Sequence, residues 1–280
     1  MPEGDSVFVL AARLRAQVGG ALVADGELRS GARAGTRLGG RRITGFDTHG
    51  KHLLMRLDDA TTLHTHLRMQ GSWTVTGPGK RVPARIQHQV RVRLRLDDGR
   101  TLWGIDLPVV ELIPTRDERA AIGHLGPDPL RDDWDPALAV SRLAARPDDT
   151  IRAALLDQRP MSGLGNLWVN EVAFLRGVHP TTRIRDVDLP PLVDLAARSL
   201  RRSATVPAAY QITTGDPRRG RTHWVVGRAG RPCLRCGTTV IGVDDPGSTS
   251  ERGRRAWWCP RCQPRLPPPP PAPPTEGAVD

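Results

Sequence analysis

The chain has 280 residues and a formal net charge of +11, carried almost wholly by arginine because only two lysines, Lys51 and Lys80, occur. It shows neither an apolar run of bilayer length nor a basic-then-apolar leader, so we expect a cytoplasmic protein that does not cross a membrane. Such an excess of positive charge favours a polyanion as partner, and nucleic acid is the commonest polyanion in cells.

The first half of the chain predicts a helix followed by strands. Residues 5–18 carry apolar side chains at helical spacing. From about residue 20 to 115 the pattern changes to short alternating runs, of which QVRVRLRL alternates strictly and is followed by the turn sequence DDG. We therefore expect an N-terminal domain over residues 1–120 with a β-sandwich or barrel.

The second half predicts helices. Residues 134–147 indicate one helix, with Asp135 as its cap and Pro136 at its first position. Further helices are indicated by DTIRAALLDQ, NLWVNEVAFLRG and LPPLVDLAARSLRRSA, which together define a helical domain over residues 128–220. The proline-rich tail, residues 265–280, cannot pack or pair regularly, and we expect it to be disordered.

A Gly-Leu-Gly-Asn turn joins two of the predicted helices and places Asn166 at the start of the second. A turn of this kind exposes backbone N–H groups at the positive end of a helix, where a phosphate can bind. Asn166 could cap the helix, donate to a phosphate or do both, and capping is the commoner role. Two glycines between helices also resemble a variant of the helix–turn–helix.

All four cysteines lie in two Cys-x-x-Cys pairs, formed by Cys233, Cys236, Cys259 and Cys262. Two such pairs can direct four thiolates at one Zn²⁺, whereas a redox motif needs only one pair. Disulfides are disfavoured in the cytosol. We therefore predict one structural Zn²⁺ with no open position, in a finger over residues 222–264 whose basic hairpin tip includes Arg254 and Arg255.

The chain begins Met-Pro-Glu-Gly. Trimming of the initiator methionine would leave Pro2 with a free secondary amine, directly followed by the carboxylate of Glu3. By itself this stretch is typical of an ordinary helix entry, with proline and acidic residues in the first turn.

Taken together and in this order, the Pro-Glu-Gly start, the GKHL stretch, the GLGN turn and the paired Cys-x-x-Cys motifs resemble the formamidopyrimidine-DNA glycosylase and endonuclease VIII family of base-excision repair enzymes. The resemblance covers residues 1 to about 264. It implies an α+β, multidomain fold: a two-layered β-sandwich, a helix–two-turn–helix domain and a β-hairpin zinc finger, with DNA in the cleft between them. The expected partner is then damaged double-stranded DNA, with single-stranded or bubble DNA left open, bound by a monomer associated with the nucleoid.

The resemblance also assigns roles to residues. It makes Pro2 the nucleophile that attacks the sugar C1′ of a damaged nucleotide, and Glu3 the acid and base that serves the sugar. Lys51 would assist acid catalysis and contact phosphate, Asn166 would hold the phosphate beside the lesion, and Arg254 would serve the δ-elimination step. Because Arg255 is adjacent, the finger arginine can also be assigned one position later.

The resemblance makes the segment THLRMQGSW the loop that fills the space left by an extruded base. Met69 would be the wedge, with Arg68 or Gln70 meeting the orphaned partner base. The alternative for Met69 is a methionine of the β-sheet core. His124 and Arg255 are further candidate DNA contacts.

Two features bear on the substrate and on the alternatives. The start PEGD is closer to the endonuclease VIII branch, and the Arg-Arg-Phe-Gly loop of the 8-oxoguanine branch is missing, although HLRM resembles that branch. Oxidised pyrimidines are therefore favoured. The alternatives are a catalytically silent DNA- or RNA-binding protein on this scaffold, which would not need Pro2, Glu3 and Lys51, and a ribosome-associated zinc ribbon, which would not need the GLGN turn.

Overall fold

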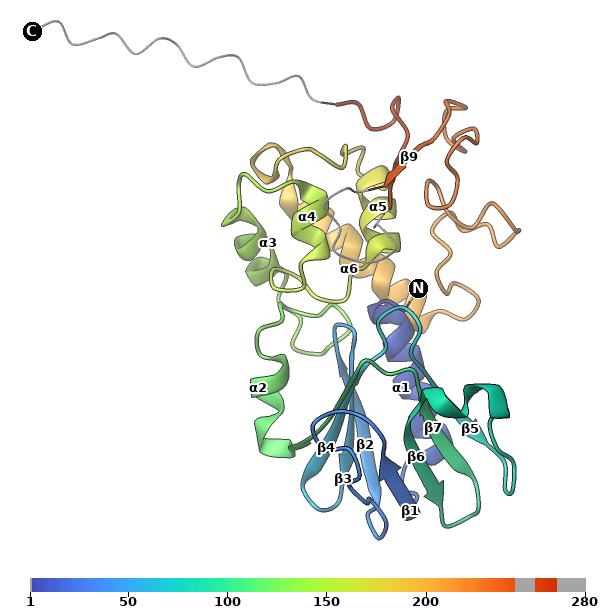
Figure 1. Ribbon diagram of the computed structural model, residues 1–280. Coiled ribbons are helices and arrows are strands. Elements are labelled where there is room, and N and C mark those ends of the chain that lie inside the picture. Colours follow the sequence, from blue (N-terminus) through green and yellow to red (C-terminus); the bar gives the residue numbers. More distant parts are fainter. Residues whose placement is uncertain (1, 245–254, 266–280) are drawn as a thin grey trace, which may run out of the picture.

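The computed structural model describes residues 2–244 and 255–265. Two bodies are stacked along the molecule: a β-rich body formed by the first part of the chain and a helical body with the finger beside it (Figure 1). Within the described residues, no helix is both long and apolar enough to span a bilayer.

The β-rich body is a sandwich of two four-stranded antiparallel sheets, with strand orders β1-β6-β7-β5 and β2-β3-β4-β8. Alternation of buried and exposed residues is clearest in β6, where the sequence VRVRLRL places its arginines away from the core. The tight turn after β6 contains Gly99 at φ +85°, a left-handed conformation that glycine adopts without steric cost. The strands are β1 (Val23–Leu28), β2 (Ile43–His49), β3 (His52–Leu57), β4 (Thr61–His66), β5 (Ser72–Thr76), β6 (Val90–Leu96), β7 (Thr101–Ile105) and β8 (Val109–Pro114).

Helix α1 (Gly4–Val18) completes the core of the sandwich. Its side chains Val7, Leu14 and Val18 are at most 1% exposed and belong to the cluster that includes residues of both sheets. The first turn of α1 lies next to the helical body. Helix α1 contacts α6 (Leu189–Thr205) of that body. The start of the chain thus lies at the junction of the two bodies (Figure 1).

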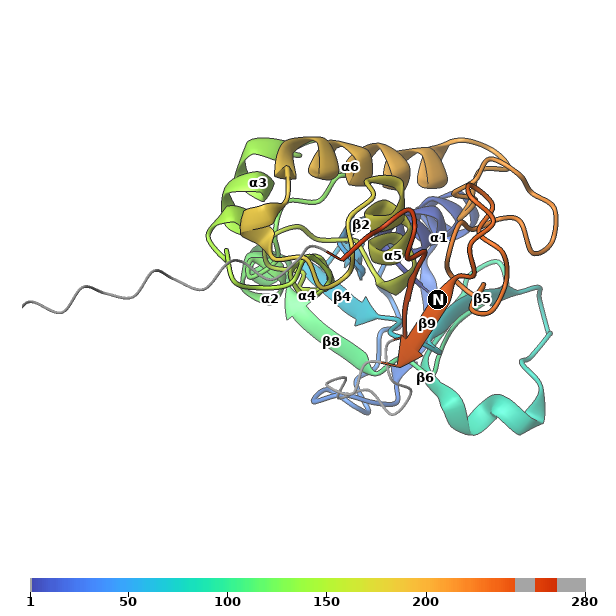
Figure 2. The same ribbon diagram turned by 90° about the horizontal axis from the view of Figure 1, so that it is seen from above.

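The helical body contains α3 (Pro136–Ala144), α4 (Ile151–Leu156), α5 (Asn166–Leu175) and α6. Asp135 caps α3 by accepting a hydrogen bond from the backbone N–H of Leu138 at 2.9 Å, as its position before Pro136 predicts. Seen from above, α6 runs past α3 and α5 (Figure 2), and it contacts both of them through one apolar cluster. The sandwich and the helical body are joined by the short helix α2 (Glu118–Ile122) and an irregular segment with several turns over residues 123–135. Three 3₁₀ helices complete the described helices: η1 (Ala84–Gln89), η2 (Thr115–Asp117) and η3 (Ile184–Asp186).

The finger is a hairpin of β9 (Ile241–Asp244) and β10 (Arg255–Trp258), which pair antiparallel. It packs on α5 through Phe174, Val225 and Val240. The guanidinium of Arg235 lies 4.4 Å from the ring centre of Phe174, which adds a cation–π contact to this apolar interface. The expected combination of sandwich, helical domain and four-cysteine hairpin is therefore confirmed, and the sandwich rather than the barrel is the correct alternative.

Candidate active site at the start of the chain

The carboxylate of Glu3 is fully buried against the first turn of helix α5. It accepts hydrogen bonds from the backbone N–H of Leu167 at 2.7 Å and of Gly165 at 2.8 Å, and a longer one from Trp168 at 3.3 Å. The first N–H groups of a helix have no partner within it and carry a partial positive charge. Glu3 therefore accepts hydrogen bonds from the first N–H groups of α5, although it lies at the start of α1.

This contact corrects the prediction for the GLGN turn. The exposed N–H groups expected to hold a phosphate are occupied by the Glu3 carboxylate, which is the anion of that site. Of the roles considered for Asn166, capping of the helix is excluded. Gly165 is the N-cap residue and Asn166 the first helical residue, and its side chain turns away to donate to the carbonyl of Arg255 at 3.0 Å.

Two glycines permit the approach of Glu3 to α5. A methyl group at Gly165 would lie 2.5 Å from the carboxyl carbon of Glu3, and one at Gly4 would lie 2.8 Å from the Cα of Gly163. The Gly4 N–H donates to the carbonyl of Gly163 at 2.9 Å, which joins the two segments directly. Close packing of backbone on backbone explains why glycine stands at these positions in the PEGD and GLGN stretches.

Burial raises the pKa of Glu3, while the Lys51 ammonium and the N–H donors of Leu167 and Gly165 oppose that shift. Removal from water destabilises the charged form of an acid, so Glu3 holds a proton more readily than an exposed glutamate. A buried carboxyl group with a raised pKa is suited to give and take back a proton during a reaction. Pro2 is half-buried and directly precedes it.

The neighbouring Asp5 is also fully buried, and sequence reasoning missed it. Its carboxylate accepts from Ser203 Oγ on α6 at 2.6 Å and from the indole Nε1 of Trp168 on α5 at 3.1 Å. These bonds fix the first turn of α1 against two helices that are distant in sequence. Nothing local in PEGD distinguishes an acid with such partners from one that faces solvent.

Lys51 lies at the tip of the hairpin between β2 and β3, and its ammonium donates to the carbonyl of Leu164 in the GLGN turn. The tip is held by further contacts with the helical body. Gly50 donates its N–H to Oδ2 of Asp128 at 2.7 Å, and His49 Nε2 lies 2.9 Å from the carbonyl oxygen of Gly126. Lys51 and Glu3 thus meet on the same turn, one at a carbonyl and the other at the N–H groups. Asp128, which is 1% exposed, was not predicted.

The loop Arg68–Gln70 follows β4, and all three side chains are exposed. Met69 is 53% exposed, so the alternative of a core methionine is excluded. Arg68 has φ +45° and donates its backbone N–H to Nδ1 of His66 at 2.9 Å. A non-glycine residue in this left-handed region is uncommon, and the loop is therefore a defined turn that displays Met69.

The remaining predicted contacts border this junction or lie outside the described residues, as Arg254 does. The ring centre of His124 lies 6.4 Å from that of His52, which follows Lys51, and the carbonyl of Arg255 accepts from Asn166. Arg255 begins β10, and its guanidinium donates to the carbonyl of Gly242 at 3.1 Å. His124 is exposed and borders an open cavity of about 490 Å³ that Arg142, Arg146 and Arg159 also line.

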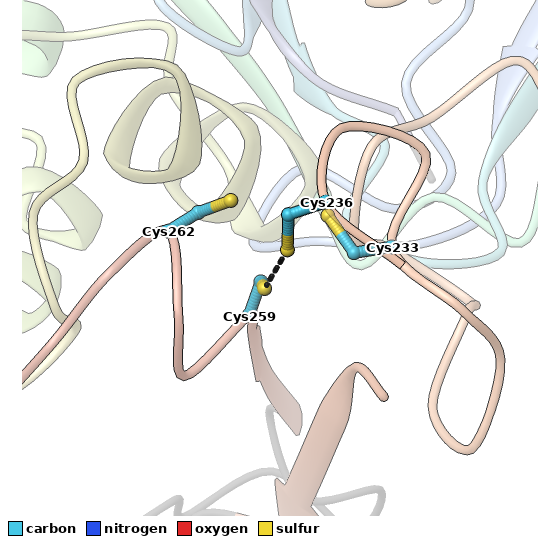
Figure 3. A group of neighbouring side chains, drawn as sticks. All are labelled: Cys233, Cys236, Cys259 and Cys262. Atoms are coloured by element: carbon cyan, nitrogen blue, oxygen red, sulfur yellow. Dashed lines mark hydrogen bonds between the residues drawn. The ribbon is translucent and has the colours of Figure 1, made fainter. Parts of the chain in front are cut away.

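The four cysteines converge as their spacing predicts (Figure 3). Their sulfur atoms all lie within 4.8 Å of one another, and Sγ of Cys236 is 3.5 Å from that of Cys259. These separations fit four thiolates around one tetrahedral ion. Burial raises the pKa of Cys259 and Cys262, and a bound cation would favour their thiolate forms.

Comparisons with known proteins give the same picture. The family model described as the formamidopyrimidine-DNA glycosylase N-terminal domain matches residues 1–107, and the model of the H2TH domain matches residues 125–201. The chain is 42% identical over 266 residues to a probable endonuclease 8 2 of Streptomyces coelicolor, with 94% of each chain covered. It is 41% identical to the DNA-(apurinic or apyrimidinic site) lyase Nei2 of Mycolicibacterium smegmatis, with 94% and 99% covered.

Solved structures share the fold at lower identity. A structure of MutM in complex with DNA containing carbocyclic 8-oxo-G superposes with a TM-score of 0.79 at 23% identity and covers 94% of this chain and 100% of that chain. Similarity at this level concerns the fold alone. The matched domains, the relatives above 40% identity and the shared fold establish that the chain belongs to the formamidopyrimidine-DNA glycosylase and endonuclease 8 family.

Proposed function

We propose that the protein is a bifunctional DNA glycosylase and AP lyase that removes oxidised bases in base excision repair. The observation that carries the proposal is the buried Glu3 carboxylate, held on the first turn of α5 beside Pro2 and sharing that turn with the Lys51 ammonium. A protein that only binds nucleic acid has no need of a buried carboxyl group with a raised pKa at the start of its chain.

In the proposed reaction, the nitrogen of Pro2 attacks C1′ of the damaged nucleotide. The bond from C1′ to the base breaks, and the base leaves with the bonding electrons and the proton that the Pro2 nitrogen gives up. The C1′–O4′ bond then breaks, O4′ takes a proton from Glu3, and the opened sugar remains bound to Pro2 as an iminium ion. The iminium then draws electrons from C2′, so that loss of a C2′ proton expels the 3′-phosphate. This chemistry requires removal of Met1, because an amide nitrogen has no free electron pair for the attack.

Glu3 supplies and accepts the proton at the sugar, and burial, which raises its pKa, lets its carboxyl group hold a proton more readily than an exposed glutamate does. Lys51 assists as an acid and contacts a phosphate. Asn166 binds the phosphate beside the lesion. Arg254 or Arg255 assists the second elimination step, the δ-elimination. Proximity of Glu3 and Lys51 to one turn supports the first two assignments, whereas the finger arginine and Asn166 rest on the family pattern.

Oxidised pyrimidines are the proposed substrates. Relatives named endonuclease 8 are 40–42% identical to the chain, whereas those named formamidopyrimidine-DNA glycosylase are 31–34% identical. We propose damaged duplex DNA as the partner, with single-stranded or bubble DNA as a further substrate. We also propose that the protein acts as a monomer in the cytoplasm and associates with the nucleoid.

The four cysteines are proposed to hold one Zn²⁺ that folds the finger and takes no part in the chemistry. When bound, the ion supplies the positive charge that stabilises the buried thiolates. We expect one zinc per chain by atomic absorption. A chelator should lower the melting temperature and weaken DNA binding, and a chain free of zinc with unchanged melting would overturn the assignment.

Borohydride trapping tests the reaction. Hydride adds to the iminium carbon, so reduction in the presence of abasic-site DNA should give a covalent adduct, which mass spectrometry should place on Pro2 of a chain lacking Met1. An adduct undiminished by Pro2→Ala with Met1 retained would contradict the mechanism. Absence of any adduct would favour the catalytically silent binding protein. A panel of duplexes with oxidised pyrimidines, 8-oxoguanine and abasic sites determines the lesion.

A further inference from the structure

Three ionisable side chains form a hydrogen-bonded row on the sheet that carries Lys51. Nδ1 of His52 on β3 lies 2.7 Å from Nε2 of His64 on β4, and Nδ1 of His64 lies 2.8 Å from Oε2 of Glu111 on β8. The three strands are consecutive neighbours in the sheet, and His64 pairs directly with Glu111. No motif of the sequence pointed to this row, and the proposed reaction does not use it.

The row lies on the sheet face opposite the sandwich core. Leu53, Met55 and Leu63, which alternate with these histidines along β3 and β4, belong to the core cluster. His64 is 3% exposed, and the Glu111 side chain at the end of the row is 52% exposed. The row therefore runs from solvent, through a buried imidazole, to the residue next to Lys51.

The donors and acceptors in this row follow from its chemistry. An ionised carboxylate can only accept, so His64 carries its proton on Nδ1. In neutral His64, Nε2 then accepts, and His52 must donate from its own Nδ1. Burial and the neighbouring histidines lower the pKa of His52 to about 3, which keeps its ring neutral. Both imidazoles are thus held in one tautomer and one orientation.

This row is the sheet-side counterpart of the contacts that the helical body makes with the same hairpin tip. On the helical side, Asp128 accepts from Gly50 and the Leu164 carbonyl accepts from Lys51. On the sheet side, His52 follows Lys51 directly in the chain and is tied through His64 to Glu111. A lysine side chain has four rotatable bonds, so the direction of its backbone decides where the ammonium can reach.

We propose that Glu111 and His64 are positioning residues for Lys51, acting through His52. Removal of the last acceptor leaves the His64 Nδ1–H unpaired and frees His52 to change tautomer and rotate. The hairpin tip then loses its support on the sheet side, and the Lys51 ammonium spends less time in the position that the reaction requires. The inference rests on the proposed function for its kinetic test, but its labelling test does not.

The labelling test uses the fact that the chain has only two lysines. Competitive acetylation, read by mass spectrometry of proteolytic peptides, compares Lys51 with the exposed Lys80 in the same molecule. We expect Glu111→Leu and His64→Leu to accelerate acetylation of Lys51 severalfold and to leave Lys80 unchanged. Glu111→Gln, whose amide oxygen can still accept from His64, should preserve the parent ratio. An unchanged Lys51 rate in Glu111→Leu overturns the inference.

The kinetic test is a double-mutant cycle. Glu111→Leu should lower kcat for base excision about 10-fold with little change in KM, as expected when the residue that orients a functional group is removed. In a Lys51→Met background the same change should have no further effect on the residual single-turnover rate. An equal loss in both backgrounds would overturn the inference, because the row would then act independently of Lys51.

Two controls separate positioning from folding and from general charge effects. Glu111→Gln keeps an acceptor for His64 and should melt near the parent, whereas Glu111→Leu leaves the buried His64 donor unpaired, and its melting temperature shows whether the chain is still folded when Lys51 is assayed. Glu27→Leu removes another carboxylate of the sandwich, which pairs with Arg29 on the surface, and should change neither readout. A parent protein without activity would contradict the proposed function, whereas the Lys51 labelling would still decide the role of Glu111.

Discussion

Glu3 and Met69 are held in opposite ways. The Glu3 carboxylate is fully buried and accepts hydrogen bonds from the N–H groups of Gly165 and Leu167 at the start of another helix, whereas Met69 is 53% exposed at the tip of a turn. A group that must hold a proton at one atom benefits from contacts that determine its position and its pKa together. A wedge for DNA must instead remain free of the protein until a base step is available to receive it. Stability and activity should therefore respond together at Glu3 and separately at Met69.

The largest expected effect is that of Gly165→Ala, which tests the close fit around Glu3. The new methyl group would lie 2.5 Å from the Glu3 carboxyl carbon, while the extended backbone at Gly165, with φ −124°, accommodates alanine. Overpacking in a fully packed site costs about 1–3 kcal/mol, which corresponds to a loss of roughly 3–10 °C in melting temperature for a chain of this size. Displacement of the acid and base should also reduce base excision by about 100-fold or more.

Calorimetry and single-turnover kinetics measure these two losses. Gly45→Ala is the matched control, because its methyl group would meet nothing within 4 Å. Addition of Glu3→Asp to Gly165→Ala shortens the clashing side chain and should recover part of the stability. If Gly165→Ala melted like the parent and kept full activity, the close packing of Glu3 would have no functional role.

Met69→Ala is expected to separate activity from stability. Surface substitutions usually change the free energy of unfolding by less than about 0.5 kcal/mol, so melting should be unaffected. Unstacking a base costs a few kcal/mol, and loss of the wedge should slow excision from duplex DNA by about 10-fold or more. The same lesion in single-stranded DNA should be removed at nearly the parent rate, and Leu138→Ala, another exposed apolar position, should behave as the parent. Equal losses on both substrates would show that Met69 is no wedge.

The comparison also explains what could be predicted from sequence. Features encoded by neighbouring residues were predictable: the cap at Asp135, the alternation in β6 and the convergence of two Cys-x-x-Cys pairs. The family resemblance drew attention to Pro2 and Glu3. How Glu3 is held was not predictable, since its partners Gly165 and Leu167 lie far along the chain.

Buried acids show the same limit. Glu171 accepts from the backbone N–H groups of Trp224, Val225 and Val226, and so attaches the first residues of the finger to α5. Asp128 holds the Lys51 hairpin in a similar way. A carboxylate that bonds to backbone N–H groups needs no particular residue type as its partner. The sequence around such a carboxylate therefore shows only an acidic residue within an apolar stretch. For Glu171 this stretch is NLWVNEVAFL.

The smallest expected effect concerns the neutral histidines beside Lys51 and tests burial as the cause. Burial, together with nearby positive groups, lowers the pKa of His52 to about 3 and that of His66 to about 4. The folded chain therefore binds fewer protons than the unfolded chain below the ordinary value of about 6.5. Their contribution to stability is complete above pH 6.5 and is lost as the pH falls from 6.5 toward 4.

Comparison of melting curves at pH 7 and pH 5 measures this contribution. Parent and variant share every other titratable group, so the difference between them isolates the histidines. The double variant His52→Gln, His66→Gln should lose less stability between the two pH values than the parent, by about 1–2 kcal/mol after allowance for partial exposure. His88 is exposed, and His88→Gln should follow the parent curve. A double variant that also follows the parent would mean that these imidazoles are hydrated as an exposed side chain is, and that burial does not hold the surroundings of Lys51 neutral.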